Sequence, residues 1–303
     1  MELNGIVNIY KEQGYTSFDV VAKIKRHLRV KAGHTGTLDP MAEGVLPVCL
    51  DKSTRLAQFI TAENKAYRTV FRLGVKTDTL DMTGLVVNER PVNVTGEDIK
   101  NAVMGFVGEI SQIPPMYSAI KVNGQRLYDM ARKGIEIERK PRNIKIYSID
   151  ITDISLPLVT MNVSCSKGTY IRTLIDDIGE VLGCGAAMEA LTRTKSGSFD
   201  ISGAIRLDEL FKAYDNGEVE RFVIKPDVVL IDYPIIRAKA MGDKAIKNGN
   251  PLNIKLFMEY EELIPGGKYR LYNNTGIFIG LYIYIEENEC FKPCVLLTDL
   301  TTL

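Results

Sequence analysis

Apolar and polar residues alternate in short segments at the start of the chain. Residues 6–10 alternate as expected for a half-buried strand, and the polar residues 11–17 predict a turn. Ser17 is a suitable N-cap for a helix, because its hydroxyl can accept a hydrogen bond from an unpaired backbone N–H. Apolar side chains then recur at helical spacing at Val20, Val21, Ile24 and Leu28. The chain is therefore expected to begin with a strand, a turn and an amphipathic helix.

Strands and helices continue to alternate without a regular repeat. The patterns predict helices at residues 53–60, 95–106 and 169–182, and strands at residues 65–75, 83–87 and 159–164. An acidic turn at residues 78–81 joins the first two of these strands, and Gly183 ends the last helix. Irregular alternation with frequent hairpins is typical of an α+β fold. We expect a mixed, mainly antiparallel central sheet with flanking helices.

The pattern changes after residue 225. Pro226 and Pro234 interrupt the chain, and the residues beyond them form β-rich segments at 269–272, 276–285 and 295–297. A chain of 303 residues also exceeds the usual size of a single core. The sequence therefore predicts a large domain at residues 1–230 and a small β-barrel at residues 236–303.

Composition and charge narrow the class of protein. Lys plus Arg and Asp plus Glu both number 38, so any nucleic-acid surface has to be local. The sequence has no run of 18 apolar residues, and its start lacks the basic and apolar regions of a secretory leader. Five scattered cysteines are typical of reduced thiols, and with only two histidines a zinc site is not expected. We expect a cytoplasmic protein without a membrane segment or a metal.

Residues 33–48 follow neither a helical nor a strand period. They include three glycines, two prolines and two carboxylates. Glycine lets a ligand approach the backbone closely, and Pro40 biases Asp39 toward an extended conformation. The pattern favours a functional loop that holds Asp39 in a fixed pose. The alternative is a capped turn, with Thr37 or Asp39 as the N-cap of a short helix near Met41.

As a whole, residues 33–48 resemble the active-site motif of the tRNA pseudouridine-55 synthases, the TruB family. The family pattern runs roughly G-H-x-G-T-L-D-P-x-A-x-G-V-L, and this sequence matches it without a gap. The resemblance implies that Asp39 is the catalytic residue. It also implies that Gly36 and Thr37 bind the substrate, and that His34 braces the RNA loop from which a base is flipped.

Two segments nearer the N-terminus carry the same resemblance. Residues 11–17 are similar to the family's K-P-x-G-x-[ST]-S turn, with Glu12 in place of the usual proline, which implies that Lys11 contacts the substrate. Residues 65–68 resemble the segment that carries the family's stacking tyrosine, here Tyr67. An aromatic ring can stack on an extruded base of any identity, and the hydroxyl of Tyr67 is a candidate to relay a proton.

Later motifs supply a partner for Asp39 and a pocket for the base. Residues 165–174 enter a helix through a glycine turn, and Arg172 matches the family's arginine that pairs with the catalytic aspartate. A carboxylate in a dry pocket would otherwise take up a proton, so a cationic partner keeps it ionised. The resemblance implies that Tyr170 binds the substrate and that Leu191 lines the uracil pocket. Residues 77–81 are similar to the family's T-D-T-x-D hairpin.

Residues 120–147 are distinctly basic, with eight Lys or Arg against three acidic residues. Such an excess is the expected footprint of a phosphate backbone, although a solvated basic face fits the composition equally well. The segment resembles the family's thumb, which closes on the T-arm of tRNA. The residues expected to contact the RNA backbone are Lys121, Arg126, Arg132, Lys133, Arg139, Lys140 and Arg142.

The C-terminal β-rich segment resembles a PUA domain, a small RNA-binding β-barrel that often follows this catalytic domain. Residues 248–251 and 277–280 carry the resemblance. From residue 227 onward the chain has 8 basic and 10 acidic residues, so this domain is not expected to be a strong basic clamp.

Together the motifs identify the chain as a stand-alone, bacterial type of the family. The resemblance implies an isomerase that flips U55 of the tRNA T-loop, breaks its glycosidic bond and re-forms the bond at C5, with no cofactor. The T-arm of tRNA is the expected partner, without guide RNA or an obligate protein partner, and the protein is expected to be a monomer. Whether Asp39 attacks C1′, adds to C6 or removes a ribose proton stays open. So do two other classes, a related enzyme of a guide-RNA ribonucleoprotein and a non-catalytic RNA-binding protein.

Overall fold

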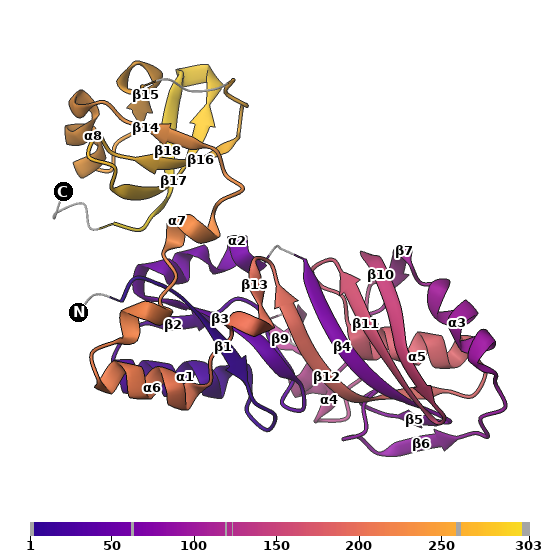
Figure 1. Ribbon diagram of the computed structural model, residues 1–303. Helices are drawn as coiled ribbons and strands as arrows, with labels where there is room; N and C mark the ends of the chain where they lie inside the picture. Colours follow the sequence, from indigo (N-terminus) through magenta and orange to yellow (C-terminus); the bar gives the residue numbers. More distant parts are fainter. Residues whose placement is uncertain (1–2, 62–63, 119, 123, 259–261, 299–303) are drawn as a thin grey trace.

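A nine-stranded sheet forms the frame of the larger part of the molecule (Figure 1). The computed structural model describes residues 3–61, 64–118, 120–122, 124–258 and 262–298. The strands are β1 Gly5–Lys11, β2 Ala32–His34, β3 Glu43–Leu50, β4 Lys65–Leu73, β7 Gly108–Gln112, β10 Arg142–Ser155, β11 Leu158–Cys165, β12 Ala186–Ser196 and β13 Phe199–Asp200. The main path runs β1-β3-β12-β4-β11-β10-β7, with β2 on β3 and β13 on β12.

Most strand pairs in this sheet are antiparallel, and β12 is the strand that joins its two halves. It pairs in parallel with β3 and antiparallel with β4. This register places Arg193 beside Gly44 on one side and opposite Tyr67 on the other. The mixed, mainly antiparallel sheet confirms the predicted α+β class, and β12 brings two segments distant in sequence to one place.

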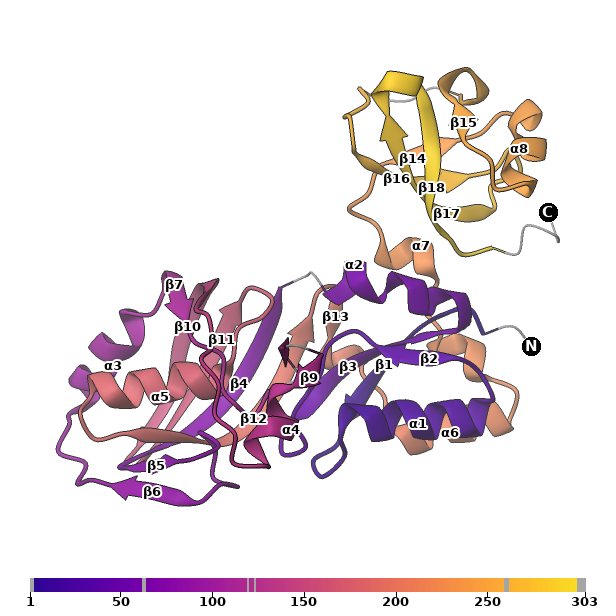
Figure 2. The same ribbon diagram turned by 180° about the vertical axis from the view of Figure 1, so that it is seen from behind.

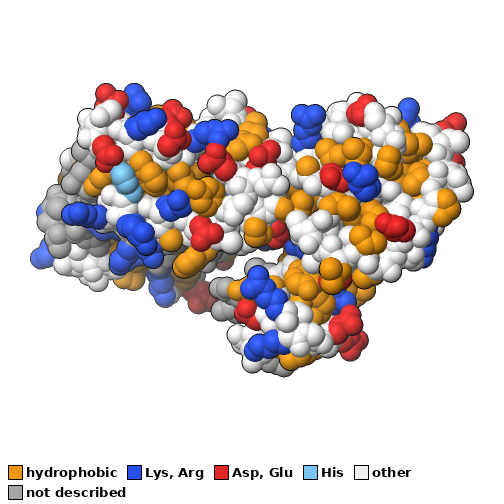
Figure 3. All heavy atoms as spheres, turned by 90° about the horizontal axis from the view of Figure 1, so that it is seen from below, with side chains coloured by type: hydrophobic (Ala, Val, Ile, Leu, Met, Phe, Trp, Pro, Cys, Tyr) orange, Lys and Arg blue, Asp and Glu red, His pale blue; other side chains and the backbone are white. Residues whose placement is uncertain are grey.

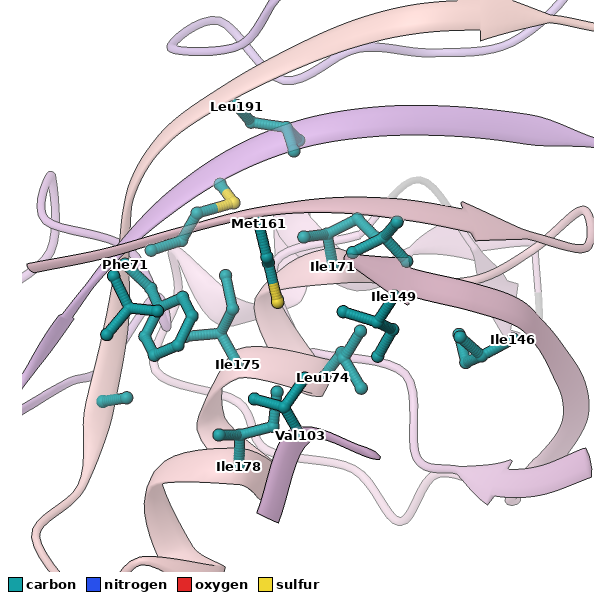
Figure 4. Close-up of a cluster of buried hydrophobic side chains, with 14 of the residues drawn as sticks. Phe71, Val103, Ile146, Ile149, Met161, Ile171, Leu174, Ile175, Ile178 and Leu191 are labelled. Atoms are coloured by element: carbon teal, nitrogen blue, oxygen red, sulfur yellow. The ribbon is translucent and has the colours of Figure 1, made fainter. Parts of the chain in front are cut away.

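Helices cover each half of the sheet with an amphipathic face. Helices α1 Ser17–Leu28 and α6 Leu207–Asp215 pack on β1 and β3, and α3 Gly96–Met104 and α5 Ile171–Val181 pack on the half with β4, β10 and β11. Figure 4 shows Leu174 and Ile178 of α5 against Met161 and Phe71 of the sheet. Each such buried side chain contributes about 1.5–3 kcal/mol, so the helical spacing of apolar residues fixes how the helices dock.

Shorter elements lie at the edges of this body. Their bounds are α2 Ala57–Thr61, β5 Val75–Thr77, β6 Val86–Glu89, β8 Lys121–Val122, β9 Gln125–Arg126, α4 Leu127–Ala131 and α7 Pro226–Val229. The hairpin β5-β6 and the group β8, β9 and α4 both depart from the main sheet. Seen from behind, α4 and β9 lie in front of the region where β12 and β4 meet (Figure 2).

The C-terminal part forms a separate five-stranded sheet in the order β14-β16-β17-β18-β15. Its elements are β14 Ile235–Arg237, α8 Asp243–Lys247, β15 Leu252–Asn253, β16 Lys268–Tyr272, β17 Phe278–Ile285 and β18 Cys290–Leu296. The sheet encloses its own buried cluster, which includes Leu271, Tyr282 and Phe291. This arrangement agrees with the predicted small β module.

Several predicted element ends differ from the observed ones. The N-cap of α1 is Thr16, not Ser17, because the Thr16 side chain accepts a hydrogen bond from Asp19 N and the Asp19 carboxylate accepts one from Thr16 N. The helix predicted at residues 53–60 starts as a 3-10 helix at Asp51–Leu56 and continues as α2.

Two further segments show the same kind of difference. The helix predicted from residue 169 begins at Ile171, and the strand predicted at 295–297 begins at Cys290. The alternative of a short helix near Met41 is wrong, because Ala42 N donates to Asp39 O at 3.0 Å in a single turn before β3 begins.

Candidate active site

The loop that carries Asp39 is fixed to the first turn of α1. Ser17 Oγ accepts a hydrogen bond from Leu38 N at 2.8 Å and donates one to Leu38 O at 3.1 Å. Both residues are buried. Because the Thr16 cap sets where α1 begins, the residue before Asp39 is held at a defined position.

Lys11 supports the same loop from behind. Its side chain is 0% exposed, and Nζ donates to Tyr15 O at 2.6 Å, Glu12 O at 3.1 Å and Pro40 O at 3.4 Å. Burial lowers the pKa of Lys11 to about 8. The structure therefore places Lys11 as a brace of the loop backbone, and its contact with a substrate stays a prediction.

Asp39 and Arg172 form the ion pair that the sequence predicts. Asp39 Oδ2 lies 2.9 Å from Arg172 Nη2, and the two side chains are 37% and 6% exposed. Arg172 Nη2 also donates to Tyr117 O at 2.7 Å, and Nη1 donates to Thr79 O at 3.0 Å. Main-chain acceptors thus hold the guanidinium in place, and the Asp39 carboxylate that binds it remains partly exposed to solvent.

Asp81 is a third member of this group that the sequence reasoning did not assign. Its Oδ2 lies 3.7 Å from Arg172 Nη1, and its side chain is as buried as that of Arg172. Its Oδ1 accepts hydrogen bonds from Thr83 N and the hydroxyls of Thr79 and Thr83. The sequence feature that could have identified Asp81 is the T-D-T-x-D hairpin. Its last aspartate is Asp81, which accepts hydrogen bonds within the turn and lies beside Arg172.

Tyr67 lies on β4 opposite Arg193 of β12. Burial raises the pKa of Tyr67, while the Arg193 guanidinium opposes this shift through its charge and a hydrogen bond. Arg193 is 1% exposed and binds the carbonyls of Val45 and Gly36 at 2.7 and 3.0 Å. The sequence reasoning assigned no role to Arg193, although it lies two residues from Leu191.

The other predicted substrate-binding residues surround this centre. Leu191 packs in the same buried cluster as Leu38, and the carbonyls of Gly36 and Thr37 face the guanidinium of Arg193. His34 ends β2, and burial together with the charge of Arg193 lowers its pKa. Tyr170 is the N-cap residue of α5, where its backbone is clamped by the Gln112 side chain. Their contacts with a substrate stay predictions.

The predicted thumb starts three residues after Tyr117, whose carbonyl accepts a hydrogen bond from Arg172 in the active site. Arg139 is partly tied down, because it donates to Pro114 O at 3.2 Å and contacts Glu136. Arg142 is exposed at the start of β10, within the predicted thumb, and the side chains of Lys121 and Arg126 lie outside the described part of the chain. Before β10, the exposed thumb cations are Arg132, Lys133 and Lys140. Figure 3, seen from below, shows a lobe with several Lys and Arg side chains set apart from the body by an open gap.

A metal centre and a membrane-spanning helix each require a characteristic arrangement of residues. The described residues contain no group of three or more His, Cys, Asp or Glu side chains arranged to hold an ion. Within the same residues, none of the helices combines the length and apolar character needed to cross a membrane.

Two solved structures match nearly the whole chain. A chain of a Cbf5-Nop10-Gar1 complex has a TM-score of 0.77 at 27% identity, covering 99% of this chain and 86% of that one. A chain of an H/ACA RNP bound to a substrate RNA containing 2′-deoxyuridine has a TM-score of 0.74 at 25% identity, covering 98% and 86%. The larger part of the molecule has the pseudouridine synthase fold.

Sequence relatives identify the family within this fold. A profile of the TruB family pseudouridylate synthase (N terminal domain) matches residues 23–171, and one of the tRNA pseudouridylate synthase B C-terminal domain matches residues 172–228. The tRNA pseudouridine synthase B of Clostridium kluyveri is 47% identical over 280 residues, covering 92% of this chain and 95% of the relative. That of Clostridium acetobutylicum is 45% identical over 298 residues, covering 98% and 100%. The chain belongs to the TruB family, which confirms the resemblance.

Proposed function

We propose that this protein converts U55 in the T-loop of tRNA to pseudouridine, with Asp39 as the reacting group. The observation that carries the proposal is the ion pair of Asp39 with the buried Arg172, in a chain of the TruB family. The pair holds a partly exposed carboxylate against a buried guanidinium, which suits a group that acts on a nucleoside. Family relatives named tRNA pseudouridine synthase B support tRNA as the substrate.

The chemistry follows from what the site offers. The target base is stacked in a folded loop, so flipping it out costs roughly a few kcal/mol, which stacking on Tyr67 and contact with Leu191 offset. With Asp39 acting on the nucleoside, the C1′–N1 bond breaks, the uracil rotates and C5 bonds to C1′. The C5 proton is then lost and N1 gains one, so atoms balance without an oxidant, a reductant or water.

RNA affinity is proposed to come from surfaces outside this centre. The exposed thumb cations lie on an element that starts three residues after Tyr117, whose carbonyl binds Arg172, so closure of the thumb on the T-arm would bear directly on the site. Residues 1–230 then act as the catalytic domain and residues 236–303 as a PUA-like domain. We propose that the protein acts in the cytoplasm as a monomer, without guide RNA or a protein partner.

Tritium release from C5-labelled uridine in a T-arm stem-loop, with the protein alone, tests the proposal. We expect release by the wild type and none by Asp39→Asn, which keeps the shape of the side chain but removes the carboxylate. The variant is expected to bind RNA almost as tightly as the wild type, because phosphate contacts elsewhere supply the affinity. Release by Asp39→Asn above background would remove Asp39 from its proposed role.

If the wild type binds the stem-loop but releases no tritium, the chain is an RNA-binding protein on an enzyme scaffold. If release requires an added guide RNA, the stand-alone reading is wrong.

A further inference from the structure

Arg193 is a buried cation that the proposed reaction does not use. Its guanidinium reaches three main-chain carbonyls: Nε donates to Val45 O at 2.7 Å, Nη2 to Gly36 O at 3.0 Å and Nη1 to Thr37 O at 3.5 Å. Two of these carbonyls belong to the loop that leads to Asp39, and the third belongs to β3, which follows that loop. The guanidinium of Arg193 therefore binds the backbone on both sides of Asp39, at Gly36 and at Val45.

The same guanidinium contacts the side of the site that carries Tyr67. Arg193 and Tyr67 are direct partners across β12 and β4, so their side chains emerge on the same face of the sheet. The charge of the guanidinium and its hydrogen bonding oppose the rise in the pKa of Tyr67 that burial causes. Asp39 and Cys165 also act on the pKa of Tyr67. Burial lowers the pKa of Lys11 and of His34, and the charge of Arg193 lowers both further.

The backbone of Arg193 is packed tightly against Gly44 of β3. Gly44 lies against the Arg193 backbone, and a β-carbon at that glycine would lie 2.3 Å from Arg193 O. Gly44 also has a φ of +102°, a conformation that glycine adopts without strain. The loop and β12 are thus in direct backbone contact at this point.

Arg193 has no acidic partner among the described residues that form ion pairs. A buried guanidinium without a counter-ion costs stability, and an apolar side chain of similar volume would not. Burial lowers the pKa of Arg193, which reflects this cost. A costly group placed between two parts of an active site points to a functional reason for its position.

We propose that Arg193 is a positioning residue that fixes the Asp39 loop and the Tyr67 ring relative to each other. It binds the loop through the carbonyls of Gly36 and Thr37 and the ring through its hydroxyl. Loss of the fork would let the carboxylate and the ring move independently, so both would be misplaced against the flipped base. The inference rests on the proposed role of Asp39 as the reacting group.

Arg193→Lys is the primary test, because it keeps the positive charge and removes the fork. We expect the single-turnover rate at saturating T-arm RNA to fall on the order of 10²-fold, since small misplacements of reacting groups have effects of that size. The dissociation constant for the RNA should stay within a few-fold of the wild type, because the phosphate contacts are untouched.

Arg270→Lys is the matched control. Arg270 also binds three carbonyls, those of Tyr233 at 2.8 Å, Asp227 at 3.1 Å and Ile231 at 3.3 Å, but it lies on β16 of the C-terminal sheet. This variant should lower the thermal midpoint and leave the single-turnover rate unchanged. If Arg193→Lys behaves in the same way, its role is structural only and the proposal is overturned.

A double substitution tests the link to Tyr67. If Arg193 acts through the ring, Arg193→Lys combined with Tyr67→Phe should lose little more rate than the more damaging single variant. Losses that multiply would show that the two residues act separately and would overturn the proposal. Arg193→Gln is studied in parallel, and failure of both Arg193 variants to fold while Arg270→Lys folds would assign Arg193 to folding instead.

Hydrogen exchange separates this inference from the proposed function. Peptides that cover residues 33–48 should exchange faster in Arg193→Lys than in the wild type, whether or not the protein releases tritium. Faster exchange in Arg193→Lys, together with a wild type that releases no tritium, would refute the function and leave the positioning intact. Unchanged exchange together with an active wild type would refute the positioning alone.

Discussion

Arg172→Lys tests whether the geometry of the arginine matters beyond its charge. Arg172 binds Asp39 at 2.9 Å and Tyr117 O at 2.7 Å through Nη2, and it binds Thr79 O at 3.0 Å through Nη1. Asp81 lies 3.7 Å from Nη1. A lysine ammonium is a single charged group on a flexible chain, so it can bind the partners of Nη2 or those of Nη1, but not both.

The expected magnitude follows from the acceptors left behind. Each buried acceptor that loses its donor costs about 1–3 kcal/mol, so losing two costs roughly 2–6 kcal/mol of unfolding free energy. Because domains are stable by about 5–15 kcal/mol, most of the variant should stay folded. Misplacement of Asp39 should lower the single-turnover rate on the order of 10²-fold, equivalent to about 2.7 kcal/mol of barrier.

The assay combines urea unfolding with single-turnover tritium release at saturating T-arm RNA. Arg72→Lys, on β4 of the main sheet, is a matched control, since Arg72 Nε lies 2.9 Å from Glu189 Oε2 in a pair that is about one third exposed. Such a pair contributes about 0–1 kcal/mol, and its loss should leave the rate unchanged. A folded Arg172→Lys variant with a rate within a few-fold of the wild type would refute the reasoning.

Three other predictions follow from the same contacts. Tyr67→Phe should keep T-arm affinity but lose about 10-fold or more in single-turnover rate, and an unchanged rate would reduce the role of Tyr67 to stacking. The pKa of Lys11 is about 8 in the folded protein and 10.5 in the unfolded chain. Between these pH values the unfolded chain binds more protons, so the free energy of unfolding rises by on the order of 3 kcal/mol as the pH increases from 8 to 10.5. Urea titrations at several pH values should show this gain in the difference between the wild type and Lys11→Met, and parallel curves would contradict it. Changing the exposed thumb cations to glutamine should flatten the salt dependence of RNA binding by roughly 0.7–0.9 in slope per lost phosphate contact, whereas changing Lys244 and Lys247 of α8 should not.

The sequence predicted the contact between Asp39 and Arg172, but not the residues that support it. Asp39, Tyr67 and Arg172 were assigned by local motifs, and the contact of Asp39 with Arg172 is present. Arg193 was missed because its role depends on β12 lying between β3 and β4, an order that no local pattern contains. Asp81 was quoted within a motif, but nothing in its neighbours reveals that the turn faces Arg172.

Lys11 illustrates a different limit of sequence reasoning. A lysine in a polar turn next to a substrate motif is normally expected to reach outward, since long charged side chains rarely become fully buried. Here the turn of residues 11–17 curls around the ammonium, and three carbonyls replace its water. The sequence shows that such a residue is charged, but only the path of the backbone shows whether its side chain points toward solvent or into the protein.

At the boundary between the two parts of the chain, prolines interrupt the sequence, but side chains from the two sheets still pack together. The interruption at residues 226–234 was visible in the sequence, and a separate sheet does follow it. Yet Leu281 and Val295 of that sheet share a buried cluster with Ile6 and Val45 of the main sheet.

Hydrogen bonds cross the same junction. Asn4 Nδ2 donates to Leu297 O at 2.7 Å, and Arg55 Nη1 donates to Leu296 O at 3.0 Å. Removing the C-terminal part would expose the shared cluster to water, at about 25 cal/mol for each Å² of apolar surface, and would weaken the main sheet at β1 and β3. A loss of activity on truncation would then report on stability as much as on RNA contacts. The RNA role of this module is therefore separable from its structural role only by changing its exposed side chains while leaving the shared cluster in place.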